Sequence, residues 1–113
     1  MKTPNNKDRL RHILDAIVKI EKYLQGYDEQ RFLDDEKTQD AIIRQLQTVG
    51  EAAKNLTSDV REANPQVAWK QIMATRDRLA HGYYLINLQI VWETTQNDLP
   101  DLKAEIEKIL ESV

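Results

Sequence analysis

The sequence predicts an all-α protein, an antiparallel up-and-down bundle of four main helices with an extra short helix. Apolar residues recur at spacings of three and four along most of the chain, which places them on one face of a helix. Glycine and proline are scarce, three of each in 113 residues, while residues with high helix propensity dominate. No segment shows the alternation of apolar and polar residues that a half-buried strand requires.

The first helix is expected over residues 7–25. Its apolar residues form one stripe that would face a core: Leu10, Ile13, Leu14, Ile17, Ile20 and Leu24. Asn6 or Asp8 is available to cap the start of this helix, and Gly26 is a suitable residue to end it.

The second helix is expected over residues 36–56. It follows a polar connection, YDEQRFLDD, that offers Asp34 or Asp35 as the next N-cap. Inside the helix, the run VGEAAKNL carries little side-chain bulk. Gly50 in this run costs about 1 kcal/mol of helix propensity relative to alanine. Its presence therefore predicts that a neighbouring helix approaches closely at this point.

A short helical turn, capped by Thr57 or Ser58, is expected before Asn64-Pro65 ends it. The third helix should begin near Val67 or Ala68 and run to about His81, with Gly82 at its end.

The fourth helix should begin after Asn87 as its N-cap. Its inner side continues the apolar spacing as far as Leu110. Pro100 interrupts this pattern, because proline lacks the backbone N–H that an interior helical residue donates. Either a kinked helix or two abutting helices is expected there.

The composition excludes several classes of protein. Cysteine is absent, which excludes a disulfide framework, a thiolate zinc site and a cysteine nucleophile. The formal net charge of −3 speaks against a protein that coats nucleic acid, although a local basic site remains compatible with it. No stretch approaches the roughly 18 apolar residues of a membrane span. We therefore expect one domain over residues 1–113, soluble, cytoplasmic and without membrane contact.

Residues 75–86, TRDRLAHGYYLI, crowd charged, imidazole and phenol groups near one helix end. Asp77 and His81 lie about 100° and 140° around an ideal helix from Arg76. Asp77 thus sits one turn before His81 and is placed to accept its ring N–H, which would fix the tautomer. Arg76 lies on an adjoining stripe and carries a planar, permanently charged fork suited to a phosphate. These groups are the ingredients for proton transfer beside an anionic substrate.

The same residues also fit an ordinary polar helix end, and spacing alone favours that interpretation. A cation near a helix C-terminus opposes the helix dipole favourably, and Arg76, Asp77 and Arg78 form a plausible solvated charge run. His12, on the polar side of the first helix, is interpreted as a surface residue. Four aromatic residues are interpreted as core or edge residues rather than as a platform for stacking nucleobases: Tyr23, Tyr27, Trp69 and Trp92.

Three segments together resemble the HepT-like family of the HEPN superfamily: VGEAAKNL, RDRLAHGYY and NLQIVWETTQNDLPDLKAEIEKI. The resemblance covers nearly the whole chain and is densest over residues 49–102. The signature of the family is an arginine, a short spacer, a histidine, one further residue and a tyrosine. Here it reads Arg76, DRLA, His81, Gly82 and Tyr83, with the polar residue Asp77 directly after the arginine.

The resemblance implies a metal-independent endoribonuclease that uses no cofactor and acts as the toxin of a type VII-like toxin–antitoxin system. It assigns Arg76 and His81 to the active site, with Asp77 in support. Family members of this kind form homodimers that bring two copies of the motif to a shared cleft. The cognate antitoxin is a minimal nucleotidyltransferase of the MntA type, which adenylylates the motif tyrosine, here Tyr83. RNA, a second copy of the chain and this antitoxin are thus the implied partners.

A non-catalytic interpretation stays open, in which the same helical frame is a binding module that docks a minimal nucleotidyltransferase. The acidic net charge mildly favours that interpretation. The chemistry of metal-free RNA cleavage, in contrast, favours a dimer. Attack of a 2′-hydroxyl on the adjacent phosphorus benefits from a base, an acid and a cation. One chain offers one credible histidine for proton transfer, His81, whereas a two-fold dimer offers two.

Overall fold

The structure is a computed structural model that describes residues 5–81 and 86–112, except for the side chain of His81. Every regular element in these two ranges is a helix. In chain order the elements are α1 (Asn6–Tyr23), α2 (Glu29–Leu33), α3 (Glu36–Lys54), α4 (Ser58–Ala63), α5 (Trp69–His81), α6 (Leu88–Glu93), the π-helix η2 (Thr94–Asp98) and α7 (Leu99–Ser112).

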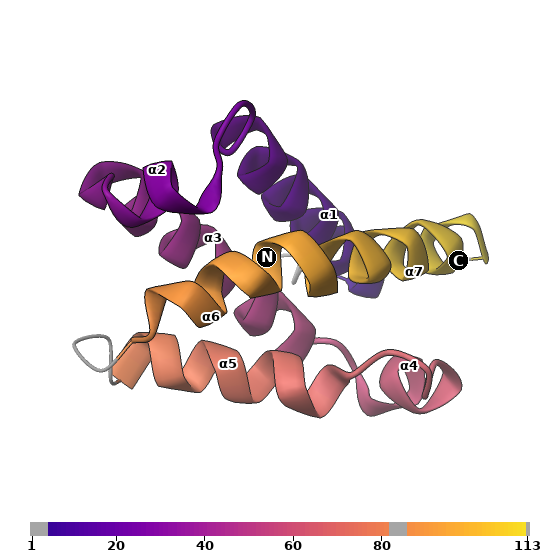
Figure 1. The fold of residues 1–113 in the computed structure, drawn as a ribbon. Coiled ribbons are helices and arrows are strands. Elements are labelled where there is room, and N and C mark those ends of the chain that lie inside the picture. Colours follow the sequence, from indigo (N-terminus) through magenta and orange to yellow (C-terminus); the bar gives the residue numbers. More distant parts are fainter. Residues whose placement is uncertain (1–4, 82–85, 113) are drawn as a thin grey trace.

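The bundle is built from α1, α3, α5 and the run formed by α6, η2 and α7, in which one element follows the other without a break (Figure 1). Helix α3 is central, because it packs extensively against both α1 and α5, while α7 lies against α1. In Figure 1, α5 lies along the lower edge of the molecule and α6 lies between α5 and α2. The expected all-α helical bundle is confirmed. Across the described part of the chain, no helix has the length and apolar character needed to cross a membrane.

The core is formed by the apolar stripes that the sequence predicts. Its largest fully buried side chains come from four elements: Leu10, Ile13, Ile17, Ile20, Phe32, Ile42 and Ile106. Trp69 is also buried, and the rings of Phe32 and Trp92 lie 5.6 Å apart between their centroids. Burial of this apolar surface supplies the main free energy of folding. His12 is exposed, as expected.

The segment YDEQRFLDD contains a helix, α2, so its prediction as a plain polar connection was wrong. The side chain of Asp28 caps this helix by accepting the backbone N–H of Arg31 at 2.8 Å. Phe32 is fully buried and anchors α2 to the core. One buried aromatic side chain and one cap are sufficient to stabilise this short helix, because α3 and α6 pack against it. The bundle therefore has two short helices, α2 and α4, where one was predicted.

The start of α1 also differs from the prediction, because its N-cap is Asn5 rather than Asn6 or Asp8. Asn5 and Asp8 form a reciprocal capping box. Asn6 instead bonds a distant turn: its amide donates to the hydroxyl of Thr57 at 2.8 Å, and its carbonyl oxygen accepts the Thr57 backbone N–H at 3.0 Å. Gly26 follows the helix end with a φ of 80°, a left-handed conformation that favours glycine.

The other helix boundaries agree more closely with the sequence. Asp35 caps α3 and Asn87 caps α6, both by accepting backbone N–H groups. Around Pro100 the helical run is continuous and contains a widened π turn. The backbone N–H of Leu99 donates to the carbonyl of Thr94, five residues earlier. Because Pro100 has no N–H to donate, a local widening upstream lets the helix continue through it.

A cluster of hydrogen bonds joins the α1–α2 loop to the start of α3. The hydroxyl of Tyr27 donates to the carboxylate of Asp35 at 2.6 Å. The backbone N–H and the hydroxyl of Thr38 donate to the same carboxylate, at 3.1 and 2.8 Å. These bonds, that of Tyr27 foremost, lower the pKa of Asp35 from 3.8 to about 2. The guanidinium of Arg31 also lies 4.0 Å from the centre of the Tyr27 ring.

Replacing Tyr27 with phenylalanine should lower the melting temperature at pH 7 and have a smaller effect at pH 2. Because the folded pKa of Asp35 lies below its unfolded value, its carboxylate stabilises the fold above about pH 4. That contribution disappears as the pH falls through the folded pKa of about 2. Thermal unfolding of both proteins from pH 7 to pH 2 measures the difference. Tyr23→Phe, at an exposed tyrosine, is the control, and an equal loss at both pH values would contradict the prediction.

Candidate functional site

The candidate site lies where α5 approaches α3 closely, at Gly50. A side chain at Gly50 would overlap the Cβ of Arg76, and its Cβ would lie 2.8 Å from the Cγ of Arg76 and 3.1 Å from the carbonyl oxygen of Ile72. The close helix approach predicted from Gly50 is therefore confirmed. The approach brings the stem of Arg76 directly against α3.

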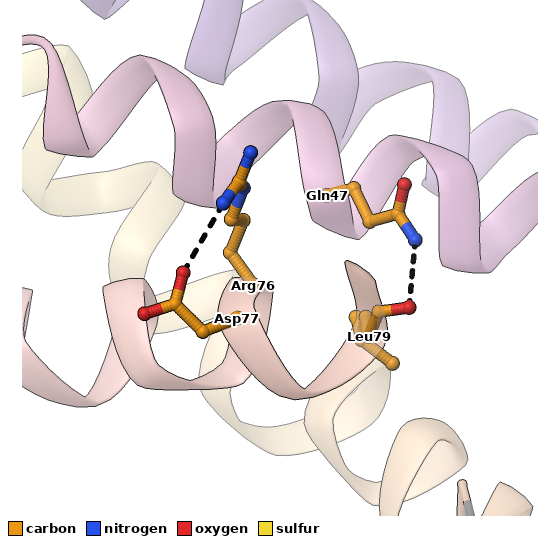
Figure 2. Close-up of polar contacts among 4 residues, drawn as sticks. All are labelled: Gln47, Arg76, Asp77 and Leu79. Carbon is orange, nitrogen blue, oxygen red and sulfur yellow. Dashed lines mark hydrogen bonds and ion pairs between the residues drawn. The ribbon is translucent and has the colours of Figure 1, made fainter. Parts of the chain in front are cut away.

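The guanidinium of Arg76 forms an ion pair with its neighbour. Its Nη1 donates to Oδ1 of Asp77 at 3.2 Å (Figure 2). The Arg76 side chain is 24% exposed and that of Asp77 is 56% exposed. A pair this open to solvent contributes at most about 1 kcal/mol to folding. Its main consequence is geometric: the stem of Arg76 lies against α3 at Gly50, and its charged end is paired with Asp77.

A second contact joins α3 to the last turn of α5. The side-chain amide nitrogen of Gln47 donates to the backbone carbonyl of Leu79 at 3.0 Å (Figure 2). Gln47 is half-buried and Leu79 is buried. The last carbonyls of a helix have no partner within the helix, so this bond satisfies one of them from outside. Sequence reasoning missed Gln47, and the only available signal was its position one turn before Gly50 on the same helix.

The residues predicted from the sequence fall on α5 as follows. Arg76 and Asp77 lie side by side and contact each other. His81 is the last residue of α5, but its side chain lies outside the described part, so the predicted contact from Asp77 to its ring stays a prediction. Gly82 and Tyr83 also lie outside the described residues.

Two hollows lie beside α5. A cavity of about 250 Å³ between α3, α5 and α7 is lined mainly by apolar side chains, among them Val49, Ile72 and Leu102. A second hollow, between α5 and α6, includes Arg78. Neither is lined by Arg76 or Asp77. The Arg76–Asp77 pair therefore lies outside both hollows.

Within residues 5–81 and 86–112, no group of three or more histidine, cysteine, aspartate or glutamate side chains is placed to hold a metal ion. The polar groups of the candidate site are instead a guanidinium, a carboxylate and a side-chain amide. The guanidinium is suited to a phosphate oxygen, which it can bind through two parallel hydrogen bonds.

Replacing Gly50 with alanine should destabilise the protein by about 1–3 kcal/mol, although alanine is the better helix former by about 1 kcal/mol. The added methyl group overlaps Arg76, so α5 must move away from α3. Urea unfolding measures the loss. Removing the opposing side chain by Arg76→Gly should relieve the overlap, so the double variant should lose less than the sum of the single losses. Strict additivity, or stabilisation by Gly50→Ala alone, would contradict this interpretation.

Comparisons with known proteins show which family the chain belongs to. The family model described as "Ribonuclease HepT-like" matches residues 13–109. "Probable ribonuclease HepT" of Thermococcus cleftensis is 37% identical over 105 residues, which cover 93% of this chain and 96% of that protein. A "Putative RNase" of Caldanaerobacter subterraneus subsp. tengcongensis is 36% identical over 111 residues, covering 98% of this chain and 97% of its own.

A longer protein of Methanocaldococcus jannaschii, named as a gamma-glutamylcyclotransferase and putative RNase, is 39% identical over 104 residues, covering 92% of this chain and 47% of its own length. No solved structure matches the chain significantly. The family match spans α3 and α5 with the whole of the Arg76–Asp77 site. The chain therefore belongs to the HepT-like ribonuclease family.

Proposed function

We propose that this protein is an endoribonuclease that cleaves RNA without a metal ion, and that it is the toxin of a toxin–antitoxin system of the type VII kind. The observation that carries the proposal is the match to the ribonuclease family over residues 13–109. The matched range contains the complete motif from Arg76 through His81 to Tyr83. The guanidinium of Arg76 beside Asp77, on a side chain that is 24% exposed, supports it, because this group is suited to a phosphodiester.

The proposed reaction begins with attack of a 2′-hydroxyl on the adjacent phosphorus. A base takes the proton of this hydroxyl as the new oxygen–phosphorus bond forms. The bond from phosphorus to the 5′-oxygen then breaks, and an acid gives that oxygen a proton. His81 is the group for proton transfer, and Arg76 opposes the negative charge that develops on the phosphoryl oxygens. Asp77 orients Arg76 through the ion pair at 3.2 Å.

The proposed active form is a homodimer with the motifs of both chains at a shared cleft. The reaction uses two proton-transfer groups, and each chain has two histidines in all. His12 is exposed on α1, whereas the Arg76–Asp77 pair lies on α5. A two-fold axis beside the C-terminal end of α5 would supply a second His81 and a second Arg76 to one phosphodiester.

Purified protein should cleave single-stranded RNA in the presence of EDTA, and Arg76→Ala and His81→Ala should each lose about 100-fold or more of the rate. Loss of a group that transfers a proton or stabilises developing charge acts on the chemical step. His12→Ala is the matched control and should retain the wild-type rate. Gel analysis of labelled RNA measures the rates, with circular dichroism to show that each variant is folded.

Equal rates for wild type and His81→Ala, or no cleavage by unmodified wild type, would reject the ribonuclease proposal. The protein would then be better explained as a binding module that docks a nucleotidyltransferase. Growth arrest on expression separates the two explanations. Arrest should disappear in Arg76→Ala and His81→Ala if the protein is a ribonuclease, and should persist in both if it acts by docking.

In sedimentation at micromolar concentration, the wild-type protein should have about twice the 13.2 kDa mass of one chain. The reason is that the proposed cleft is complete only with two copies of the motif. A single species with the mass of one chain, in a sample that cleaves RNA, would contradict the shared cleft.

The proposed off-switch is adenylylation of Tyr83 by an MntA-type nucleotidyltransferase, the antitoxin. Tyr83 stands two residues after His81 in the chain. A bulky, anionic AMP group at this point would repel and obstruct an incoming RNA phosphate. The matched pair Tyr83 and Tyr84 offers a direct comparison, because the second tyrosine lies outside the motif.

After co-expression with the nucleotidyltransferase, the intact mass should increase by one or more AMP units. The increase should be absent in Tyr83→Phe and retained in Tyr84→Phe, because only the first removes the proposed acceptor hydroxyl. Mass spectrometry of the three proteins, with RNA cleavage measured in parallel, checks the proposal. An unchanged wild-type mass would contradict it, as would loss of the modification in Tyr84→Phe alone.

A further inference from the structure

We infer that Gln47, on α3, is a positioning residue for the active site at the end of α5. This inference rests on the proposed ribonuclease function and concerns a residue outside the motif. The amide of Gln47 bonds the carbonyl of Leu79 at 3.0 Å, two residues before His81. Gln47 acts through the backbone of α5 and makes no contact with the substrate in this proposal.

The geometry of the motif depends on the last turn of α5. Arg76 and His81 are five residues apart, so their relative direction follows from helical winding over residues 77–81. The final turn of a helix frays easily because its carbonyls lack partners in the helix. The bond from Gln47 supplies a partner in this turn, and it comes from a helix that packs in the core.

Helix α3 thus holds the motif segment at two points. The stem of Arg76 packs against Gly50, and Gln47, one turn earlier on α3, donates a hydrogen bond to the carbonyl of Leu79. The two helices run antiparallel here, because the lower-numbered residue of α3 meets the higher-numbered residue of α5. The first contact sets the start of the motif and the second sets the turn that ends at His81.

A second glutamine of α3 has the same bonding pattern at a helix end without the motif. The side-chain amide of Gln39 donates to the carbonyls of Phe32 and Leu33, at 2.9 and 3.0 Å, where α2 ends. Gln39 is buried. It provides a control that loses bonds of the same kind, two rather than one, at a distance along α3 from Arg76.

The experiment compares Gln47→Met, Gln47→Glu and Gln39→Met with wild type in RNA cleavage from pH 4.5 to pH 8. Gln47→Met keeps the length of the side chain and removes the donor. Its kcat should fall by about 10- to 100-fold, with KM for RNA changed by less than about twofold because Arg76 remains in place. Gln39→Met should keep the wild-type kcat at temperatures where it is folded.

Gln47→Glu supplies a readout that a loss of stability does not imitate. Near neutral pH the introduced carboxylate has no proton to donate to the Leu79 carbonyl, so kcat should be reduced. Once the carboxyl is protonated, below about pH 5, its O–H is a donor again. The ratio of its kcat to that of wild type should therefore rise as the pH falls, whereas the ratio for Gln47→Met should not rise.

The two histidines allow a measurement that does not require activity. The chain contains only His12 and His81, so their ring signals in NMR spectra are separable by a His12→Ala assignment. In Gln47→Met the His81 signal should shift or broaden while that of His12 stays in place. Gln39→Met should leave both signals unchanged.

An unchanged kcat together with an unchanged His81 signal in folded Gln47→Met would overturn the inference. So would the same changes in Gln39→Met, because they would show a general loss of stability. If wild type fails to cleave RNA, the proposed function fails, and the His81 signal still decides whether Gln47 positions the helix end.

Discussion

The arrangement of the molecule depends on the contact between α3 and α5 at Gly50. Without a side chain at this position, the backbone of α3 lies directly against the Cβ and Cγ of Arg76. The same helix also packs on α1, so the contact links the apolar core to the charged end of α5. A glycine within a helix lowers the helix propensity of its segment. Here its small size allows α5 to approach and so places Arg76 against α3.

Several side-chain hydrogen bonds in this fold join the end of one helix to a residue of another. The side-chain amides of Gln39 and Gln47, both on α3, donate hydrogen bonds to backbone carbonyls at the ends of α2 and α5. Two carbonyls just after the end of α3 also have side-chain partners. Arg9 donates to the carbonyl of Asn55, and Arg61 donates to that of Leu56. Orphan carbonyls that water would otherwise solvate are thus used to join helices. The helix ends become fixed parts of the tertiary structure.

Those interactions explain which parts of the structure were predictable from the sequence. The stripe on α1 and the close approach at Gly50 follow from local spacing and residue size, and both are present. Helix α2 was missed, because its stability comes from the burial of Phe32 rather than from a repeating pattern. Gln47 could not be recognised either, since its partner Leu79 is 32 residues away in the chain. The roles assigned to His81 and Tyr83 rest on the family motif.

The π turn of η2 determines which sides of α6 and α7 face the core. Val91 of α6, Thr95 of η2 and Leu99 of α7 are all buried. Along an uninterrupted α-helix, eight residues would turn Leu99 about 80° away from Val91. A π turn contains roughly one more residue than an α-helical turn, so each of its residues rotates the chain by a smaller angle. This difference cancels most of the rotation and brings Leu99 back to the side of Val91. Residues 94–98 therefore set the rotation of α7 relative to α6. With this rotation, α6 packs against α2 while the apolar stripe of α7 packs against α1. The number of residues in this segment is consequently as constrained as their identity.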